Sequence, residues 1–248
     1  MTAIILAAGV GKRLLEASGG RPKCLLQVGG RPLIRRLLDD LAAVGVREAV
    51  VVTGFGAEQV RAAVDGPLGA IDVRCVHNPR YTEGAILSLW TAREVLDRPV
   101  LVMDADVLCG QAMLRRLVAS PHPNCFLLDA SAENTGEEQM LLVRGGQVRN
   151  IVRGGAPGYD LMGESIGFLR LSADGARLLR ELLGLRIAAG DTGIEHEQVY
   201  PELLARTHVG FERVDGMPWI EIDFPEDLVR AEREVLPRLG APRAPAAR

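Results

Sequence analysis

The chain has 248 residues and a formal net charge of −3, a size that one α/β domain can fill around a single core. Hydrophobic residues make up 48% and charged residues 25%, which excludes a disordered composition, and the near-balanced charge disfavours a general nucleic-acid binder. No apolar run approaches the roughly 20 residues needed to cross a bilayer, so we expect a cytoplasmic protein without membrane or nucleic-acid partners.

The first half of the chain alternates between strand and helix signals. Residues 4–6 form a short apolar run that ends in small residues and glycine, as a buried parallel strand does before a loop. Leucine and isoleucine then recur at helical spacing over residues 33–41, and Gly45 ends that pattern. A strand at residues 49–54 and further alternation follow. This order predicts an α/β, Rossmann-like fold with a mostly parallel sheet flanked by helices.

Short strands predominate after about residue 124. The pair Gly145–Gly146 between two apolar runs indicates a β-hairpin. The other elements expected here are strands at residues 125–129 and 165–171, helices at 173–184 and 195–205, a strand at 219–223 and a helix opened by Pro225. Residues 240–248 carry no core pattern and are expected to be disordered. We therefore predict a single domain over residues 1–239 that ends in a mixed sheet region.

Cysteine and histidine show no metal-binding pattern. The cysteines are widely spaced, with no CxxC pair and no nearby histidine to complete a zinc site, so we expect reduced structural thiols. The histidines form no triad by their spacing, and we expect surface or hydrogen-bonded polar residues. The residues concerned are Cys24, Cys75, Cys109 and Cys125, and His77, His122, His196 and His208.

Positive charge is concentrated at the start of the chain, where residues 1–36 hold seven Lys or Arg residues and only one acidic residue. Within this segment, Gly9 and Gly11 follow the first strand directly. Glycine lets backbone N–H groups approach phosphate oxygens and accepts positive φ. Arg13 offers a fork of donors to the β and γ phosphates, and Lys23 supplies a point charge where negative charge develops during transfer. The segment therefore predicts a phosphate cradle.

Two familiar phosphate loops do not match this segment. A dinucleotide fingerprint needs a third glycine at position 14, where the chain has Leu14. A P-loop needs Ser or Thr after its lysine, whereas Arg13 follows Lys12. The remaining alternative, a glycine turn with solvated charges, is disfavoured because the loop, the basic pair and Lys23 occur together.

The motif LAAGVGKRL at residues 6–14, followed by PKCLLQVGGRPLI at residues 22–34, resembles the sugar-phosphate nucleotidyltransferase superfamily. The stretches NPRYTEGAILSLW, VMDADVL and WIEIDFPEDL resemble its phosphocholine and aminoalkylphosphonate cytidylyltransferase branch. The similarity runs from residue 2 to about residue 236. It implies a GT-A-like nucleotidyltransferase fold, with a nucleotide-binding half at about residues 1–120 and an acceptor-binding half at about residues 121–239.

The same resemblance implies roles for residues of the first half. It implies that Ala7, Ala8 and Gly9 contact the nucleoside and phosphates through their backbone, and that the helix around Ser88 borders the base pocket. Gly11, Arg13 and Lys23 complete the phosphate cradle. For Ser88 an ordinary strand-to-helix connection is an equally favoured alternative.

The segment MDADVL, residues 103–108, places Asp104 and Asp106 at the end of another strongly apolar strand. Ligands of open α/β sheets bind outside the carboxyl ends of strands. Mg²⁺ takes carboxylate oxygens and keeps several waters, so one or two carboxylates suffice. Asp106 matches the metal aspartate of the resembled family, and Asp223 holds the family's second position in the acidic stretch 215–228. We therefore expect Mg²⁺ as cofactor on Asp106 and Asp223, with a supporting role favoured for Asp104.

A phosphate monoester is largely dianionic at neutral pH, so its oxygen can attack without a general base. Catalysis then consists of in-line positioning and charge neutralisation by Mg²⁺, Lys23 and Arg13. The residues and the resemblance together predict a magnesium-dependent enzyme that transfers a nucleoside monophosphate from an NTP, with CTP favoured, to a small phosphate or phosphonate and releases pyrophosphate.

The second half is expected to bind the acceptor. Asp129 and Glu197 lie in acidic stretches that an ammonium group could contact, although solvated acidic loops are the alternative. The segment GESIGF at residues 163–168 resembles the acceptor-side strand of the same branch, which implies Glu164 as a further acceptor residue. Tyr159 and Trp219 are aromatic candidates for the same pocket, with core packing as their alternative. A quaternary ammonium prefers an aromatic cage, whereas a primary ammonium prefers carboxylates. Because aromatic residues are few, we expect 2-aminoethylphosphonate in preference to phosphocholine.

Other activities stay open at this point. Phosphocholine, inositol phosphate and sugar phosphates are alternative acceptors. A GT-A glycosyltransferase is the rival enzyme, because Asp104 and Asp106 form an acidic-x-acidic pair, and a nucleotide-binding module without turnover is the rival from another class. The glycine loop with Lys23 disfavours the first, and the joint presence of Arg13, Lys23, Asp106 and Asp223 disfavours the second. The oligomeric state is open, with a homodimer as one option.

Overall fold

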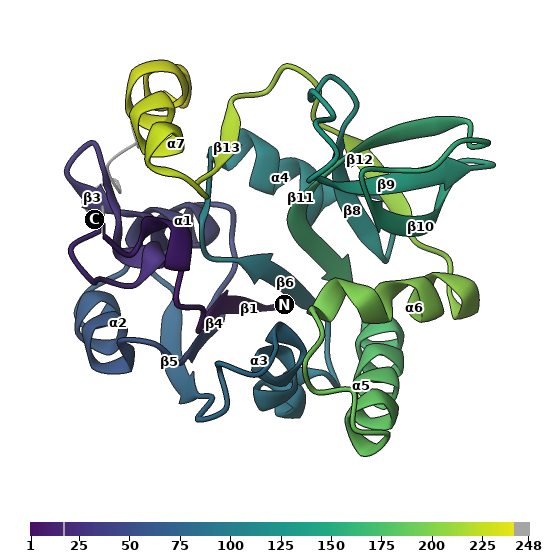
Figure 1. Ribbon diagram of the computed structural model, residues 1–248, viewed down its shortest axis with the longest axis horizontal. Coiled ribbons are helices and arrows are strands. Elements are labelled where there is room, and N and C mark those ends of the chain that lie inside the picture. The colour runs from purple at the N-terminus through teal and green to yellow at the C-terminus, as the bar shows by residue number, and fades with distance from the viewer. Residues whose placement is uncertain (17, 241–248) are drawn as a thin grey trace.

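The computed structural model describes residues 1–16 and 18–240. A nine-stranded mixed sheet runs through the molecule, with helices on both faces (Figure 1). Its order is β10-β9-β11-β6-β1-β4-β5, and β8 pairs with β11 and β12. The strands are β1 (Thr2–Ala7), β4 (Glu48–Thr53), β5 (Asp72–His77), β6 (Val100–Asp104), β8 (Cys125–Asp129), β9 (Gln139–Arg144), β10 (Gln147–Arg153), β11 (Leu161–Leu171) and β12 (Gly210–Arg213).

The strands β6, β1, β4 and β5 pair in parallel. Three of them, β1, β4 and β6, consist mainly of Val, Ile, Leu and Ala and are almost wholly buried, as parallel strands covered on both faces are. Neighbouring residues of β1 enter different cores, since Ile5 packs in one and Ile4 in the other. The predicted α/β class with a mostly parallel, helix-flanked sheet is confirmed.

Amphipathic helices cover both faces of the sheet. Leu38 of α1, Val60 of α2 and Leu114 of α4 pack in the core that contains Ile5. Helices α3, α5 and α6 pack in the core that contains Ile4. The bounds are α1 (Leu33–Ala43), α2 (Ala57–Val64), α3 (Ala85–Thr91), α4 (Gln111–Ala119), α5 (Ala173–Ala188), α6 (Tyr200–Arg206) and α7 (Pro225–Arg230). None of the helices in the described part of the chain has the length and apolar surface that a membrane crossing needs.

The second half adds antiparallel strands to this sheet. The predicted hairpin forms between β9 and β10, with Gly145 and Gly146 at positive φ in its turn. The long strand β11 pairs with β9 through its first residues and with β6 through its last. Its pairing with β8 shifts register between Ser165 and Leu169, around Gly167 at φ +72°. This bend carries β11 from the hairpin back to the parallel strands.

A two-stranded ribbon joins distant parts of the chain. The strand β7 (Val107–Cys109) pairs with β13 (Trp219–Glu221), and Ile222 N–H continues the ladder by donating to the Asp106 carbonyl oxygen at 3.1 Å. Ile220 and Ile222 are buried in a third apolar cluster together with Leu14, from the N-terminal segment, and Val235, from beyond α7. The small hairpin of β2 (Gln27–Val28) and β3 (Arg31–Pro32) contributes Val28 to this cluster. The C-terminal segment is thereby fixed against the N-terminal one.

Some predicted elements differ in the structure. The helix expected at residues 195–205 is a 3-10 turn, His196–Val199, followed by α6, because Glu195 and Gln198 form a capping box and Pro201, in the first turn of α6, cannot donate to a continuous helix. The strand expected at residues 219–223 ends at Glu221. All four cysteines are free thiols, as predicted. Of the tail expected to be disordered, residues 241–248 lie outside the described residues.

The bend in β11 depends on Gly167, and replacing it by alanine is expected to destabilise the fold. An added Cβ would stand 2.4 Å from the Asp104 Oδ2 atom, on a backbone that L-residues rarely adopt. We expect Gly167→Ala to lower the free energy of unfolding by roughly 1–3 kcal/mol, measured by urea denaturation.

Gly146 supplies the matched control, since it also has positive φ but its added Cβ would meet nothing within 4 Å. In Gly146→Ala only the unfavourable backbone conformation costs free energy. We therefore expect this variant to lower the free energy of unfolding less than Gly167→Ala does. Equal losses in the two variants would contradict the close approach of Gly167 to Asp104.

Candidate active site

The loop after β1 places Lys23 at the carboxyl end of the parallel strands. Gly11 has φ +61°, and a Cβ there would stand 3.1 Å from the Lys23 Cβ atom, so glycine allows the loop to lie directly against this lysine. Gly9, for which we expected the same freedom, is exposed and is absent from the positive-φ glycines of the described chain. The absence of a side chain at Gly9 instead leaves its backbone accessible, since nothing lies within 4 Å of an added Cβ.

Lys23 lies between the two predicted metal ligands. Its Nζ donates to Asp106 Oδ2 at 2.6 Å and to Asp223 Oδ1. Only 14% of the Lys23 side chain is exposed. Burial alone would lower the pKa of the lysine, but the two carboxylates outweigh it and raise that pKa above its ordinary value. The structure thus brings together three predicted residues from three parts of the chain.

A third carboxylate, Glu221, completes an acidic cluster with Asp106 and Asp223, in which one oxygen of each lies within 4.8 Å of the others. The pKa of Glu221 is raised because surrounding protein displaces water from its carboxyl group and because Asp106 and Asp223 carry like charge. Glu221 shares a strand face with Asp223, but the sequence alone favours only Asp223, which stands at the strand's end.

The cluster fits a divalent cation. Asp106 Oδ1 is buried without a hydrogen-bond partner among the described residues, and three carboxylates outnumber the single ammonium of Lys23. Oxygen ligands of this kind suit Mg²⁺ better than a softer metal. Asp106, Asp223 and Glu221 are therefore the residues that would hold the ion.

Arg13 lies at the mouth of the site. Its side chain is 54% exposed, its Nη1 stands 3.5 Å from Asp223 Oδ2 and its guanidinium lies 4.8 Å from the centre of the Phe224 ring. Asp227 holds the two residues that Arg13 contacts. Its Oδ2 accepts from the backbone N–H groups of Asp223 and Phe224 at 3.0 and 2.8 Å. Asp227 therefore fixes the strand end that carries Asp223.

A pocket of about 840 Å³ opens beside this cluster. It runs from Arg13 and Asp223 to β11 and the turn that follows α5. Its lining is strongly acidic, with three arginines, Arg13, Arg153 and Arg230. The acidic side chains are Asp104, Asp129, Glu133, Glu137, Glu138, Glu164, Glu195, Glu197, Glu221, Asp223 and Asp227. Such a wall repels phosphates unless cations are bound with them, and it favours a ligand with positive charge.

Three predicted acceptor residues line one wall of the pocket. Trp219 Nε1 donates to the buried Asp129 Oδ2 at 2.8 Å. Glu164 pairs with Asp129 across β11 and β8. Burial, with like charge on Glu138 and Asp129, raises the pKa of Glu164 to about 7. Glu197, the fourth predicted residue of the pocket, lies on the wall formed after α5.

Other predicted site residues lie outside the pocket. Tyr159 packs under Arg144, with the guanidinium 5.0 Å from its ring centre, and does not line the pocket. Ser88 is buried in α3 and accepts from Asn78 Nδ2 at 3.0 Å. Ala7 and Ala8 are buried at the end of β1, where the Ala8 carbonyl accepts from Phe55 N–H at 3.0 Å. Nucleotide contacts of these residues stay predictions.

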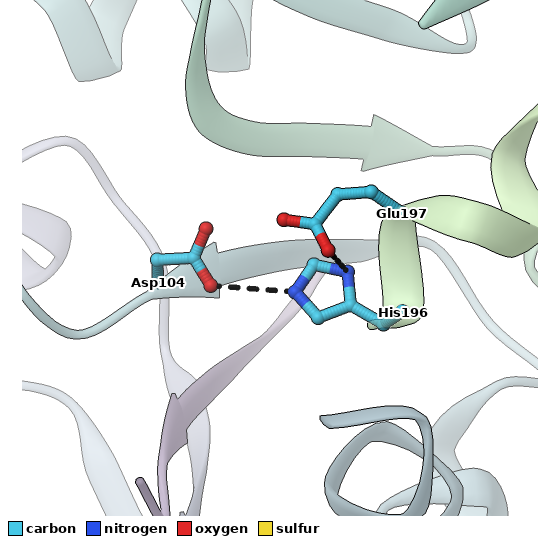
Figure 2. A group of neighbouring side chains, drawn as sticks. All are labelled: Asp104, His196 and Glu197. Carbon is cyan, nitrogen blue, oxygen red and sulfur yellow. Dashed lines mark hydrogen bonds and ion pairs between the residues drawn. The ribbon is translucent and has the colours of Figure 1, made fainter. Parts of the chain in front are cut away.

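A buried histidine lies behind the pocket wall. His196 is 4% exposed and stands between Asp104 and Glu197 (Figure 2). Burial raises the pKa of Asp104 to about 6 against the opposing effect of His196. No role for His196 follows from the sequence, because nothing in its spacing connects it with Asp104, 92 residues earlier.

Solved structures share the whole fold. The CTP:phosphocholine cytidylyltransferase of Streptococcus pneumoniae superposes with a TM-score of 0.77 at 24% identity, over 93% of this chain and 97% of that one. The inositol-1-phosphate CTP transferase of T. maritima gives 0.74 at 18% identity, over 94% and 97%. These likenesses establish the fold.

Curated relatives carry related names. The CMP-5'-(3-aminopropyl)phosphonate synthase of Streptomyces rubellomurinus is 42% identical over 120 residues, 48% of this chain and 19% of that protein. A bifunctional IPC transferase and DIPP synthase of Rubrobacter xylanophilus is 31% identical over 94% of this chain and 52% of its own length. This chain therefore spans about half or less of these two relatives. The 2-aminoethylphosphonate cytidylyltransferase of Lancefieldella rimae is 28% identical over 84% of this chain and 80% of its own.

The family model for the MobA-like NTP transferase domain matches residues 3–153, more than half of the chain. This range contains the glycine loop, Lys23 and Asp106, whose arrangement is described above. On the match and on the shared fold, the chain belongs to the MobA-like NTP transferase family.

Proposed function

We propose that this chain is a magnesium-dependent cytidylyltransferase that transfers CMP from CTP to a small amine-bearing phosphonate, 2-aminoethylphosphonate being the best candidate, and releases pyrophosphate. One observation carries the proposal. Lys23 is buried between Asp106 and Asp223 and lies against Gly11 of the glycine loop, and Asp223 in turn lines the large acidic pocket. A fixed cation next to carboxylates and a phosphate cradle suits nucleotidyl transfer.

The reaction requires little covalent chemistry from the protein. An oxygen of the phosphonate dianion attacks the α-phosphorus of CTP, forming one P–O bond while the bond to the β-phosphate oxygen breaks and pyrophosphate leaves. The nucleophile already carries negative charge, so no side chain has to remove a proton. The work of the site is to align the two anions and to balance their charge.

The residues of the site divide this work by position. Lys23, the more buried cation, neutralises charge at the transferred group, and Arg13, at the exposed mouth, contacts the departing pyrophosphate. Asp106, Asp223 and Glu221 would hold Mg²⁺, which when bound supplies charge neutralisation for the phosphate oxygens. Asp227 keeps Asp223 in place through its backbone contacts.

The acceptor proposal rests on the charge of the pocket. Glu164 and the buried Asp129 lie on one wall, Glu197 lies on the wall after α5, and the aromatic rings that line the pocket are those of Trp219 and Phe224. A primary ammonium can donate to several carboxylates, whereas a trimethylammonium needs an aromatic cage. Two relatives, an aminopropylphosphonate synthase and an aminoethylphosphonate cytidylyltransferase, support the same class. With its free thiols, the enzyme suits a reducing compartment, and we propose the cytoplasm.

The proposal predicts the outcome of one assay panel. Pyrophosphate release is measured with each of four NTPs against 2-aminoethylphosphonate, phosphocholine, inositol phosphate and glucose 1-phosphate. We expect CTP with 2-aminoethylphosphonate to give the highest kcat/KM, by about tenfold or more over phosphocholine.

Other results would revise the proposal in defined ways. Preference for phosphocholine or inositol phosphate would keep the reaction and refute the acceptor. Release of a nucleoside diphosphate in place of pyrophosphate would indicate a glycosyltransferase. If the protein bound CTP but released pyrophosphate with none of the acceptors, the proposal that it is an enzyme would be refuted.

A further inference from the structure

Asp104, His196, Glu197 and Tyr200 form a cluster behind the pocket wall that follows α5. His196 Nε2 stands 3.4 Å from Asp104 Oδ1, and Nδ1 stands 3.4 Å from Glu197 Oε2 and 3.0 Å from the Tyr200 hydroxyl. Asp104 comes from the end of β6, and the other three residues come from the turn after α5 and the start of α6. One imidazole thus joins two carboxylates that approach it from different elements.

Both carboxylates also face the pocket. Asp104 and Glu197 line it, whereas His196 does not. Their second oxygens, Asp104 Oδ2 and Glu197 Oε1, form no hydrogen bond among residues 1–16 and 18–240 and stand clear of the ring on the same side (Figure 2). Gly167, without a side chain, leaves space beside Asp104 Oδ2. Two carboxylates therefore offer free oxygens to a common space.

One ligand atom of each of Asp104, His196 and Glu197 lies within 4.8 Å of the others. The two carboxylates, however, contact different nitrogens of the ring. A metal site would require both carboxylates to converge with the lone pair of a single nitrogen. The contacts instead match a ring whose Nε2 faces Asp104 and whose Nδ1 contacts the Tyr200 hydroxyl at 3.0 Å, with Glu197 Oε2 at ion-pair distance from the same nitrogen.

In the part of the chain that the structure describes, neither carboxylate is paired with a basic side chain other than the histidine. Asp104 and Glu197 form no ion pair with Lys or Arg within the described chain. Their free oxygens are therefore available to a cationic group in the pocket that they line.

We propose that His196 is a positioning residue, which holds Asp104 and Glu197 as a two-carboxylate clamp for the primary ammonium group of the acceptor. This inference rests on the proposed function and deepens it. The ammonium donates to the two free oxygens, and the imidazole keeps those oxygens apart from each other and turned to the pocket. An N-trimethyl group offers no donor to the clamp, so the same geometry discriminates against it.

The contribution of the amine is measured as a ratio. It is the kcat/KM with 2-aminoethylphosphonate divided by the kcat/KM with ethylphosphonate, which lacks the amine. We expect His196→Gln to lower this ratio about tenfold or more, through a higher KM for 2-aminoethylphosphonate. The values for ethylphosphonate and for CTP should change by less than about twofold. The N-trimethyl derivative should gain relative to 2-aminoethylphosphonate.

Two further variants keep the test decisive. Glu197→Gln leaves the buried ring in place and should lower the same ratio, so it carries the test if His196→Gln fails to fold in a thermal scan. His208→Gln, at an exposed histidine outside the pocket, should leave the ratio unchanged.

Each other outcome overturns the clamp. If His196→Gln lowered kcat/KM equally with both phosphonates, His196 would have a structural role only. If the ratio were unchanged and activity were kept, His196 would have no part in recognising the amine. A wild-type ratio near one would show that the amine is not bound there. Failure of the wild type to release pyrophosphate with either phosphonate or with phosphocholine would refute the proposed function, and the clamp with it.

Discussion

Asp106→Ala is expected to lower kcat for CMP transfer by roughly three orders of magnitude, because metal-assisted charge neutralisation contributes several kcal/mol. Asp106 carries the buried, unpartnered oxygen of the acidic cluster and accepts from Lys23. Asp223→Ala should give a loss of similar size, since it removes the other partner of Lys23. Pyrophosphate release at saturating CTP and acceptor measures the effect.

The metal itself is tested on the wild-type protein. EDTA should abolish turnover and added Mg²⁺ should restore it. Glu226→Ala is the matched control, because Glu226 is an exposed carboxylate three residues after Asp223 that does not line the pocket. Wild-type activity in Asp106→Ala, or equal losses in Asp106→Ala and Glu226→Ala, would refute the assignment.

Lys23→Ala and Arg13→Ala are expected to fail in different ways. Removing a fixed charge at the reacting group typically lowers kcat by about 10²–10³, and we expect this for the buried Lys23. Its loss also removes the ammonium that contacts both Asp106 and Asp223. Arg13 is more than half exposed and contacts the leaving group in our proposal, so its loss should raise KM for CTP with a smaller change in kcat.

Lys12→Ala controls for charge alone. Lys12 is exposed and belongs to the same basic segment, but it forms no ion pair within the described residues. A change below about twofold is expected, as for surface charges away from a site. If Lys12→Ala lost as much kcat as Lys23→Ala, the overall charge of the segment, and not the position of Lys23, would account for the effect.

Sequence patterns predicted the fold because each signal is local. Apolar runs before small residues correspond to β1 and β4, leucines at helical spacing correspond to α1, and paired glycines correspond to the β9–β10 turn. The residues Lys23, Asp106 and Asp223 were selected individually from strand ends and from family motifs. The structure adds that one lysine contacts both carboxylates.

The remaining features depend on contacts that no local pattern encodes. His196 and Asp104 meet only because β6 and the turn after α5 end at the same edge of the sheet. Periodicity identifies apolar faces and cannot show that a buried histidine lies between two carboxylates. Tyr159 was selected as an aromatic residue of the second half, but its direction depends on the β10–β11 connection, which turns it toward Arg144.

The ribbon of β7 and β13 also bears on the order in which the protein becomes competent during synthesis. Lys23 and Asp223 are 200 residues apart, and Asp223 reaches the lysine only through a strand formed near the end of the chain. Domains fold as synthesis proceeds, and contacts of long sequence separation form late. A nascent chain can therefore assemble its parallel sheet on the ribosome while the ion pair at its centre is still incomplete. The proposed catalytic centre is therefore complete only after β13 and Asp223 have been translated and have folded against the N-terminal segment.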